Sequence, residues 1–222
     1  MQKKNRIKWG MILAAAVLLS GCGKKEALQG SMTPSQSYVE STREKLPVGT
    51  EAAGKGKQVK VPDWVDVQII PVHGVARRGE KLEGVKNIVL HYVGNPGTTA
   101  QNNRDFFAGD QAEVSAHFVV GLNGEIIQCV PLDEKSSASN FRNKDTISIE
   151  TCHPDETGKY TEATYRAEVK LVAWLCQTYG LTEKDVIRHY DVTGKECPRY
   201  FVQHEDAWEQ FLKDVGKALA SA

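Results

Sequence analysis

Short runs of β-branched and aromatic residues recur along the C-terminal part of the chain, separated by turn-forming residues. Their length and composition predict strands at residues 87–93, 116–122, 125–131, 146–152 and 185–192. Asn123-Gly124 separates the second run from the third, and this dipeptide suits the positive φ angles of a type I′ turn. We therefore expect these two strands to pair as a hairpin.

Apolar positions three or four residues apart predict helices between these strands. The longest helix is predicted at residues 161–180, with Thr161 as its N-cap and Gly180 as its stop. Two more helices are predicted at residues 99–109 and 204–219. Strands that alternate with helices indicate an α/β (mixed α+β) fold, with a central mixed β-sheet of about five to six strands flanked by about three helices.

The first 22 residues have the pattern of an export signal. Basic residues precede an apolar run at residues 11–19, and "LSGC" follows. The apolar run is shorter than the roughly 20 residues that span a bilayer, which makes a transmembrane helix the weaker alternative. "LSGC" resembles the bacterial lipobox, in which the chain is cut before the cysteine and the cysteine is acylated. The resemblance implies a signal peptide at residues 1–21 and an extracytoplasmic protein, lipid-anchored through Cys22 to a bacterial membrane.

Residues 22–60 are rich in Lys, Glu, Gly, Ser and Gln and have no apolar periodicity, which predicts a flexible linker after the lipidated cysteine. Residues 61–222, about 160 residues, suffice for one domain, which we expect to be monomeric. The formal net charge is +0, and removal of residues 1–21 would leave it at about −4. This charge, and a sequence without a long basic stripe, argue against nucleic acid as a partner.

The segment "RHYDVTGKECPRY", residues 188–200, combines an imidazole and a thiol around a Thr-Gly turn. This turn would fold the loop with Cys197 back over the strand end with His189. Imidazole nitrogen and thiolate sulfur bind zinc, and a catalytic zinc site has three protein ligands and one open position. His91, which precedes an open Gly- and Pro-containing loop, is the candidate third ligand. His91 could instead be a hydrogen-bonded core histidine, and Cys197 a buried free cysteine or half of a disulfide.

Four segments together carry a resemblance to a known family: "VLHYVG", "SAHFVVGLNGEIIQCVP", "TISIE" and "RHYDVTGKECPRYF". In this order and spacing they resemble the zinc-dependent type 2 N-acetylmuramoyl-L-alanine amidases, which share their fold with phage amidase-type lysozymes and peptidoglycan recognition proteins. The similarity covers residues 67–208, and HxDxTGKxCP is its most specific part. It implies one Zn²⁺ bound by His91, His189 and Cys197. The implied substrate is peptidoglycan, cleaved at the amide between N-acetylmuramic acid and L-alanine.

Two alternatives of other classes stay open. The chain could be a non-catalytic peptidoglycan receptor on the same fold, or a structural lipoprotein. The thiol of Cys197 argues against the receptor, because a protein that only binds has no evident use for a third metal ligand.

Two charged residues are candidates for catalysis. Alternation along "TISIE" turns Glu150 away from the apolar side of its strand. A carboxylate in an apolar strand needs a partner, and a metal-bound water would be one, so we expect Glu150 to act in proton transfer. Lys195 lies two residues before Cys197, and the resemblance implies that it stabilises the oxyanion. An ordinary solvated Glu and a solvated Lys are the alternatives.

The sequence departs from the family pattern in two places. Relatives similar to the phage enzyme and the recognition proteins carry a catalytic Tyr where this chain has Ala116, which makes Glu150 more necessary. Residues 136–145 lack the Trp and His that many relatives place near the start of this stretch. Asn140 and Arg142 in it are candidate contacts to sugar or peptide, unless the loop is merely solvated. His117 either lines the substrate groove or is a structural hydrogen-bonded histidine.

The remaining cysteines allow at most one disulfide. With Cys22 acylated and Cys197 on the metal, Cys129, Cys152 and Cys176 are left. Cys176 lies on the apolar stripe of the long helix and is expected in the core. Cys129 and Cys152 could pair only if their strands bring them within disulfide reach.

Overall fold

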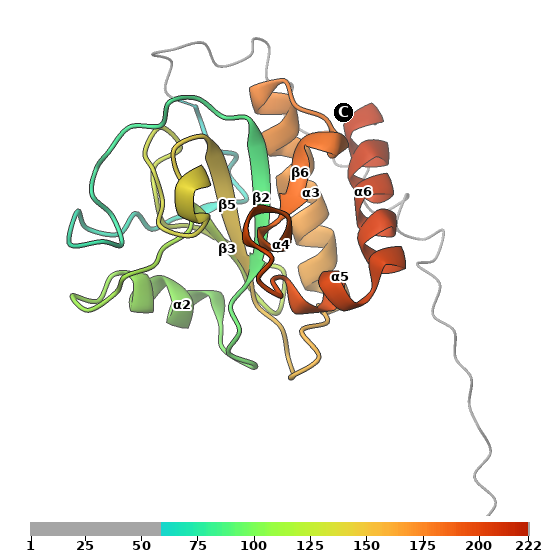
Figure 1. Cartoon of the computed structure of the whole chain (residues 1–222), viewed down its shortest axis with the longest axis horizontal. Coiled ribbons are helices and arrows are strands. Elements are labelled where there is room, and N and C mark those ends of the chain that lie inside the picture. Colours follow the sequence, from blue (N-terminus) through green and yellow to red (C-terminus); the bar gives the residue numbers. More distant parts are fainter. Residues whose placement is uncertain (1–58, 222) are drawn as a thin grey trace, which may run out of the picture. The chain divides into compact units, whose positions relative to one another are not determined.

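The computed structural model describes residues 59–221, and Cys22 and the leader lie outside this range. The described residues form a six-stranded sheet with helices on both faces (Figure 1), which confirms the predicted mixed α/β fold. The strands are β1 (Asp66–Val67), β2 (Asn87–Tyr92), β3 (Phe118–Val120), β4 (Ile126–Gln128), β5 (Thr146–Thr151) and β6 (Val186–Arg188). The helices are α2 (Ala100–Phe107), α3 (Glu162–Tyr179), α4 (His189–Thr193), α5 (Arg199–Gln203) and α6 (Glu205–Ala220), with 3-10 turns η1 (Asn140–Arg142) and η2 (Glu183–Asp185). Among residues 59–221, none of the helices has both the length and the apolar character needed to span a bilayer.

The strand order is β1-β4-β3-β5-β2-β6, and only β3 and β4 are antiparallel. This pair is the predicted hairpin, but its turn is not type I′. Gly124 alone in the loop has a positive φ, of 85°, and its N–H bonds the Gly121 carbonyl at 3.1 Å. Five residues separate the two strands, and the Gly121 N–H bonds the Glu125 carbonyl at 2.8 Å, so residues 122–124 form the turn, with a glycine where a left-handed conformation is required. A Cβ at Gly124 would also lie 2.9 Å from the Ala163 carbonyl oxygen.

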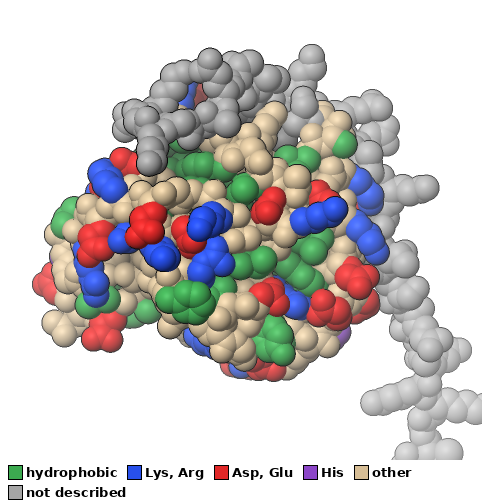
Figure 2. Space-filling model, turned by 45° about the horizontal axis from the view of Figure 1, so that its top comes forward, with side chains coloured by type: hydrophobic (Ala, Val, Ile, Leu, Met, Phe, Trp, Pro, Cys, Tyr) green, Lys and Arg blue, Asp and Glu red, His purple; other side chains and the backbone are tan. Residues whose placement is uncertain are grey.

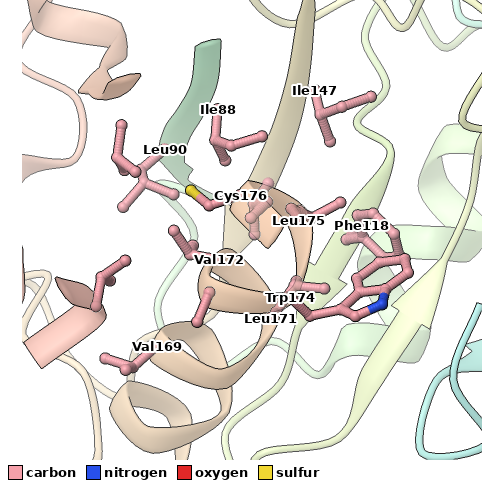
Figure 3. Packing of buried hydrophobic residues seen from close by; sticks show 14 of the residues in the cluster. Ile88, Leu90, Phe118, Ile147, Val169, Leu171, Val172, Trp174, Leu175 and Cys176 are labelled. Carbon is pink, nitrogen blue, oxygen red and sulfur yellow. The ribbon is translucent and has the colours of Figure 1, made fainter. Parts of the chain in front are cut away.

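Alternation along the strands divides the sheet into an apolar face and a face that carries polar groups. On the apolar face Ile88 and Leu90 of β2 and Ile147 of β5 pack against the buried side of α3 (Figure 3). α6 covers the same face beside α3. The opposite face of β2 and β5 carries His91 and Glu150. A second, smaller apolar cluster under α2 covers the neighbouring part of that face. His91, Ser148 and Glu150 of the two central strands thus lie on one side of the sheet.

The helix α3 begins and ends where the sequence predicts. The Thr161 side chain accepts a hydrogen bond from the Thr164 N–H at 3.0 Å and caps the N-terminus. Gly180 ends the helix in a left-handed conformation with φ 67°. α2 and α6 likewise lie within one or two residues of their predicted ranges.

The last predicted strand is corrected by the structure. β6 ends at Arg188, and His189 is the first residue of a short helix, α4, rather than the end of a strand. The Asp191 carboxylate accepts a hydrogen bond from the Arg188 N–H at 2.8 Å and pairs with the Arg188 guanidinium at 3.0 Å. An acidic residue three positions after the last extended residue is a helix-start signal that outweighs the β-branched composition here.

The cysteines among the described residues are buried free thiols: Cys129, Cys152, Cys176 and Cys197. The possible disulfide between Cys129 and Cys152 is therefore not formed. Cys176 lies in the main core, as its position on the helical stripe predicts.

A buried carboxyl group lies on the apolar side of the sheet. Glu168 of α3 has an exposed fraction of 0%, and its Oε1 accepts a hydrogen bond from the Thr151 hydroxyl at 2.6 Å. Its Oε2 contacts no donor among the described residues. Burial raises the pKa of Glu168 from 4.5 to about 8, and the Thr151 hydrogen bond only partly opposes this. The folded protein therefore keeps this carboxyl protonated near neutral pH.

Glu168→Gln should flatten the pH dependence of stability. In the wild-type protein, the contribution of Glu168 to the free energy of unfolding is complete below the unfolded pKa of 4.5 and falls as the pH rises toward the folded pKa of about 8. The slope is at most about 1.4 kcal/mol per pH unit. The variant should therefore gain stability over the wild type between pH 5 and pH 8, measured by urea unfolding. Glu209→Gln, at an exposed position of α6, is the control, and an equal pH response in both variants would contradict the assignment.

Candidate functional site

Three of the predicted residues converge at the end of the sheet. His91 is the fifth residue of β2, His189 opens α4, and Cys197 lies between α4 and α5. One possible ligand atom from each lies within 4.8 Å of the others. The Cys197 Sγ is 3.9 Å from the His91 Nδ1, and the two imidazole centroids are 4.6 Å apart. Residues 106 positions apart in sequence thus form one compact cluster.

The chain after β6 returns to the sheet as the Thr-Gly turn predicts. Gly194 ends α4 with φ 78°, and its N–H bonds the Tyr190 carbonyl at 2.7 Å. The Tyr190 N–H in turn bonds the Cys197 carbonyl at 2.9 Å. These bonds close a loop that brings the thiol next to the histidine at the start of the same segment.

In both imidazoles the Nε2 atom has a hydrogen-bond partner outside the cluster. His91 Nε2 lies 3.1 Å from the Ser139 hydroxyl, and His189 Nε2 lies 2.8 Å from the Asn140 Oδ1. His189 Nδ1 is buried and has no partner among the described residues. Both Nδ1 atoms are therefore left for a ligand that accepts a lone pair.

The donor set fits a zinc ion. Two imidazole nitrogens and one thiolate are zinc ligands, and three protein ligands leave a fourth position for water. Burial, followed by the charges of His189 and Lys195, lowers the pKa of His91 well below 6.5, and burial and Lys195 lower that of His189. Protons therefore do not compete for these nitrogens at neutral pH.

Burial shifts the pKa of the Cys197 thiol upward, whereas it shifts the pKa values of the two histidines downward. Burial, and to a lesser degree Glu150, raises the pKa of Cys197 to about 12, while the Tyr92 N–H and Lys195 oppose this. A bound divalent cation would reverse this preference, because a coordinating thiol is deprotonated. Metal binding at this cluster should therefore release a proton.

Glu150 lies directly beside His91. β2 and β5 pair in parallel with His91 opposite Glu150, so the two side chains project from the same face. The Oε2 of Glu150 is buried and has no partner among the described residues. Burial raises the pKa of Glu150 to about 8, and the charge of Lys195 lowers it. The carboxyl thus sits next to the cluster with an oxygen free to exchange a proton.

Lys195 is exposed, and its charge acts on His91, His189, Glu150 and Cys197 alike. It also lines a cavity of about 630 Å³ together with His189. The cavity wall further contains Val75, Val114, Asn140, Phe141 and Asn143, with charged residues Arg78, Glu80, Glu113, Lys135 and Lys144. On the face seen in Figure 2, Lys, Arg, Asp and Glu side chains are interspersed rather than gathered by sign.

The other predicted contacts have structural partners. His117 is fully buried; its Nδ1 accepts from the Ser148 N–H at 3.0 Å and its Nε2 bonds the Glu134 carbonyl at 2.9 Å. Burial lowers its pKa to about 4, so it is neutral. These bonds favour the structural alternative over a place in the substrate groove.

Arg142 also binds within the protein. Its guanidinium bonds Asp145 Oδ1 at 2.7 Å and Asn87 Oδ1 at 2.6 Å, which ties η1 to the start of β2. Asn140 does line the cavity, but its Oδ1 is engaged by His189. Ala116 is fully buried in the second apolar cluster. Ser139 was not predicted, and no feature of a serine in a serine-rich loop distinguishes it.

Comparison with known proteins fits this geometry. Residues 81–200, more than half of the chain, match the profile of the N-acetylmuramoyl-L-alanine amidase family, Amidase_2. The chain belongs to this family. The amidase CwlL of Bacillus licheniformis is 33% identical over 169 residues, 68% of this chain and 46% of that protein. BlyA of Bacillus subtilis (strain 168), also named N-acetylmuramoyl-L-alanine amidase, is 32% identical over 179 residues, 69% of this chain and 48% of that protein.

This amidase-family chain therefore spans about half the length of these curated relatives. Among solved structures, the catalytic domain of XlyA is 27% identical with a TM-score of 0.59, over 68% of this chain and 99% of that one. A mutant endolysin from Bacillus subtilis is 28% identical with a TM-score of 0.59, over 68% of this chain and 98% of that one. The family and the fold expected from the sequence are both confirmed.

Cys197→Ala should weaken zinc binding by more than about 100-fold, because loss of a ligand exceeds the 10- to 100-fold effect of losing a group that merely supports one. The measurement is zinc content after dialysis, together with competition against a chelator. Cys152→Ala, which removes another buried thiol, is the matched control and should bind one zinc ion like the wild type. Full zinc in the Cys197 variant would show that the thiol is not a ligand.

Proposed function

We propose that this chain is a zinc-dependent N-acetylmuramoyl-L-alanine amidase, which hydrolyses the amide between N-acetylmuramic acid and L-alanine in peptidoglycan. The observation that carries the proposal is the convergence of His91, His189 and Cys197 beside a buried, unpartnered oxygen of Glu150. Membership of the amidase family, and relatives that bear this name, support the choice of bond.

The reaction has three requirements: an activated water, a proton route to the leaving nitrogen, and stabilisation of the oxyanion. Zinc held by His91, His189 and Cys197 would lower the pKa of a bound water toward 7 and polarise the amide carbonyl. Glu150, whose Oε2 is buried without a partner among the described residues, would accept the proton of the attacking water and donate it to the leaving nitrogen. A carboxyl whose pKa lies near the operating pH suits both halves of this transfer.

We propose that Lys195 stabilises the oxyanion. Its charge acts on all three proposed ligands and on Glu150, and we assign to its ammonium the stabilisation of the charge that develops on the carbonyl oxygen. It is exposed and lines the cavity, so a substrate can approach it directly.

The cavity is proposed as the substrate site. A volume of about 630 Å³ is within the usual range for ligand pockets, and its wall includes His189 and Lys195. Val75, Val114 and Phe141 are exposed apolar side chains on this wall. They offer contact area to the apolar parts of a sugar-peptide, and the lysines and arginine around them can pair with its carboxylates.

Glu150→Gln should keep zinc and lower the hydrolysis rate by about 10² to 10⁴, because the amide cannot accept the proton. The assay is digestion of purified peptidoglycan with mass analysis of the released stem peptides. Glu156→Gln, an exposed position beyond the same strand, should retain the wild-type rate. Wild-type turnover in the Glu150 variant would exclude the acid–base role. Zinc and muropeptide binding without hydrolysis by the wild type would favour a receptor instead.

We further propose that Cys22 is acylated and anchors the mature chain to a membrane, on the strength of the lipobox-like "LSGC" alone. Cys22→Ala should then move the protein from the membrane fraction to the soluble fraction when lysed cells are fractionated by centrifugation. Cys129→Ala, at a buried thiol of the domain, serves as the control for general effects of losing a cysteine. A Cys22 variant that stays with the membrane would exclude a lipid on this residue.

A further inference from the structure

One loop contacts both histidines of the metal cluster from behind. Ser139 and Asn140 are consecutive, and each reaches the Nε2 atom of one imidazole: the Ser139 Oγ lies 3.1 Å from His91 Nε2, and the Asn140 Oδ1 lies 2.8 Å from His189 Nε2. Ser139 and His189 are buried. No charged group is involved in either contact.

The contact with Asn140 determines which nitrogen of the His189 ring carries the proton. A neutral imidazole has one N–H and one lone pair, and the bond made at one nitrogen fixes which atom carries the proton. The carbonyl oxygen of a carboxamide only accepts, so the contact with Asn140 requires the proton of His189 on Nε2. The lone pair is then on Nδ1, the atom that is buried without a partner. Histidines that bind metals commonly donate their other N–H in this way.

The loop itself is held in a defined conformation. The Asn143 Oδ1 accepts hydrogen bonds from the Ala138 N–H at 3.1 Å and the Ser139 N–H at 2.6 Å. The Ser136 hydroxyl bonds the Ser148 hydroxyl of β5 at 2.6 Å. Asn140 has φ 54°, a left-handed conformation that Asn tolerates better than most residues. The backbone that carries the Ser139 hydroxyl and the Asn140 carboxamide is thus held in place by the protein itself.

We propose that Ser139 and Asn140 are positioning residues for the metal site: they hold the rings of His91 and His189 in the orientation that presents both Nδ1 atoms to one ion, and Asn140 also fixes the tautomer of His189. This inference rests on the proposed zinc site. Under this proposal the Asn140 side chain orients His189, whereas the sequence suggested that it contacts substrate. Asn140 also lines the cavity, so the loop that orients the ligands forms part of the substrate wall.

Asn140 allows a test that separates its backbone from its side chain. Asn140→Gly removes the acceptor and suits the positive φ, so the fold is retained, whereas Asn140→Asp keeps an acceptor oxygen at the same place. We expect zinc affinity, measured by chelator competition, to fall about 10- to 100-fold in the glycine variant and to return to within a few-fold of wild type in the aspartate variant. Ser139→Ala should weaken zinc binding through His91 in the same way.

Phe141→Ala, in the same loop but without a contact to either histidine, is the control and should leave zinc affinity unchanged. A second readout is the ¹⁵N chemical shifts of the His189 ring in the metal-free protein, which should report the Nε2–H form in the wild type and a mixture in Asn140→Gly. Wild-type zinc affinity in Asn140→Gly would overturn this inference and leave the zinc site standing. Failure of the wild type itself to bind zinc would overturn both.

Discussion

Parallel, in-register pairing of β2 with β5 sets His91 directly opposite Glu150, and the rest of the site is built outward from that pair. β2 also pairs with β6 on its other side, so the chain that leaves β6 starts α4 with His189 next to His91. A slip of one residue in the β2–β5 register would turn His91 or Glu150 toward the apolar face, where α3 packs. The long apolar core behind the sheet therefore also fixes the geometry of the polar side.

Burial then gives the cluster its chemical character. In low-dielectric surroundings the uncharged form of each group is favoured, which keeps the imidazoles neutral and the thiol and carboxyl protonated. The neutral imidazoles are ready to bind a cation, whereas the thiol must first lose its proton. Metal affinity should therefore rise with pH through Cys197 rather than through the histidines. Lys195 adds a positive charge at the open side, which favours the ionised form of both Cys197 and Glu150.

Much of the site could be read from the sequence because its main signals are local. Alternation placed Glu150 off the apolar face, the Thr-Gly turn predicted the return of Cys197 to His189, and caps defined α3. The sequence does not indicate contacts between side chains that are distant along the chain. His117 is bonded by Ser148 and Glu134, which nothing around it in the sequence indicates. Asn140 meets His189 from 49 residues away, and Arg142 meets Asn87 from 55 residues away. The predicted strand through His189 followed the β-branched composition, whereas Asp191 is a local helix-start signal that prevails in the structure.

Two carboxyl groups with raised pKa values lie within this fold, and their surroundings separate their roles. Glu150 and the Thr151 partner of Glu168 are adjacent on β5 and project from opposite faces. Burial raises both pKa values to about 8. Glu168 is fully buried on the apolar side of the sheet with one hydroxyl partner, on the face opposite the metal-binding cluster. Glu150 is half-buried, with an ammonium and the metal-binding cluster beside it, so its proton can move. A raised pKa alone would make both residues candidates for proton transfer. The neighbouring charge and the partial exposure to solvent favour Glu150.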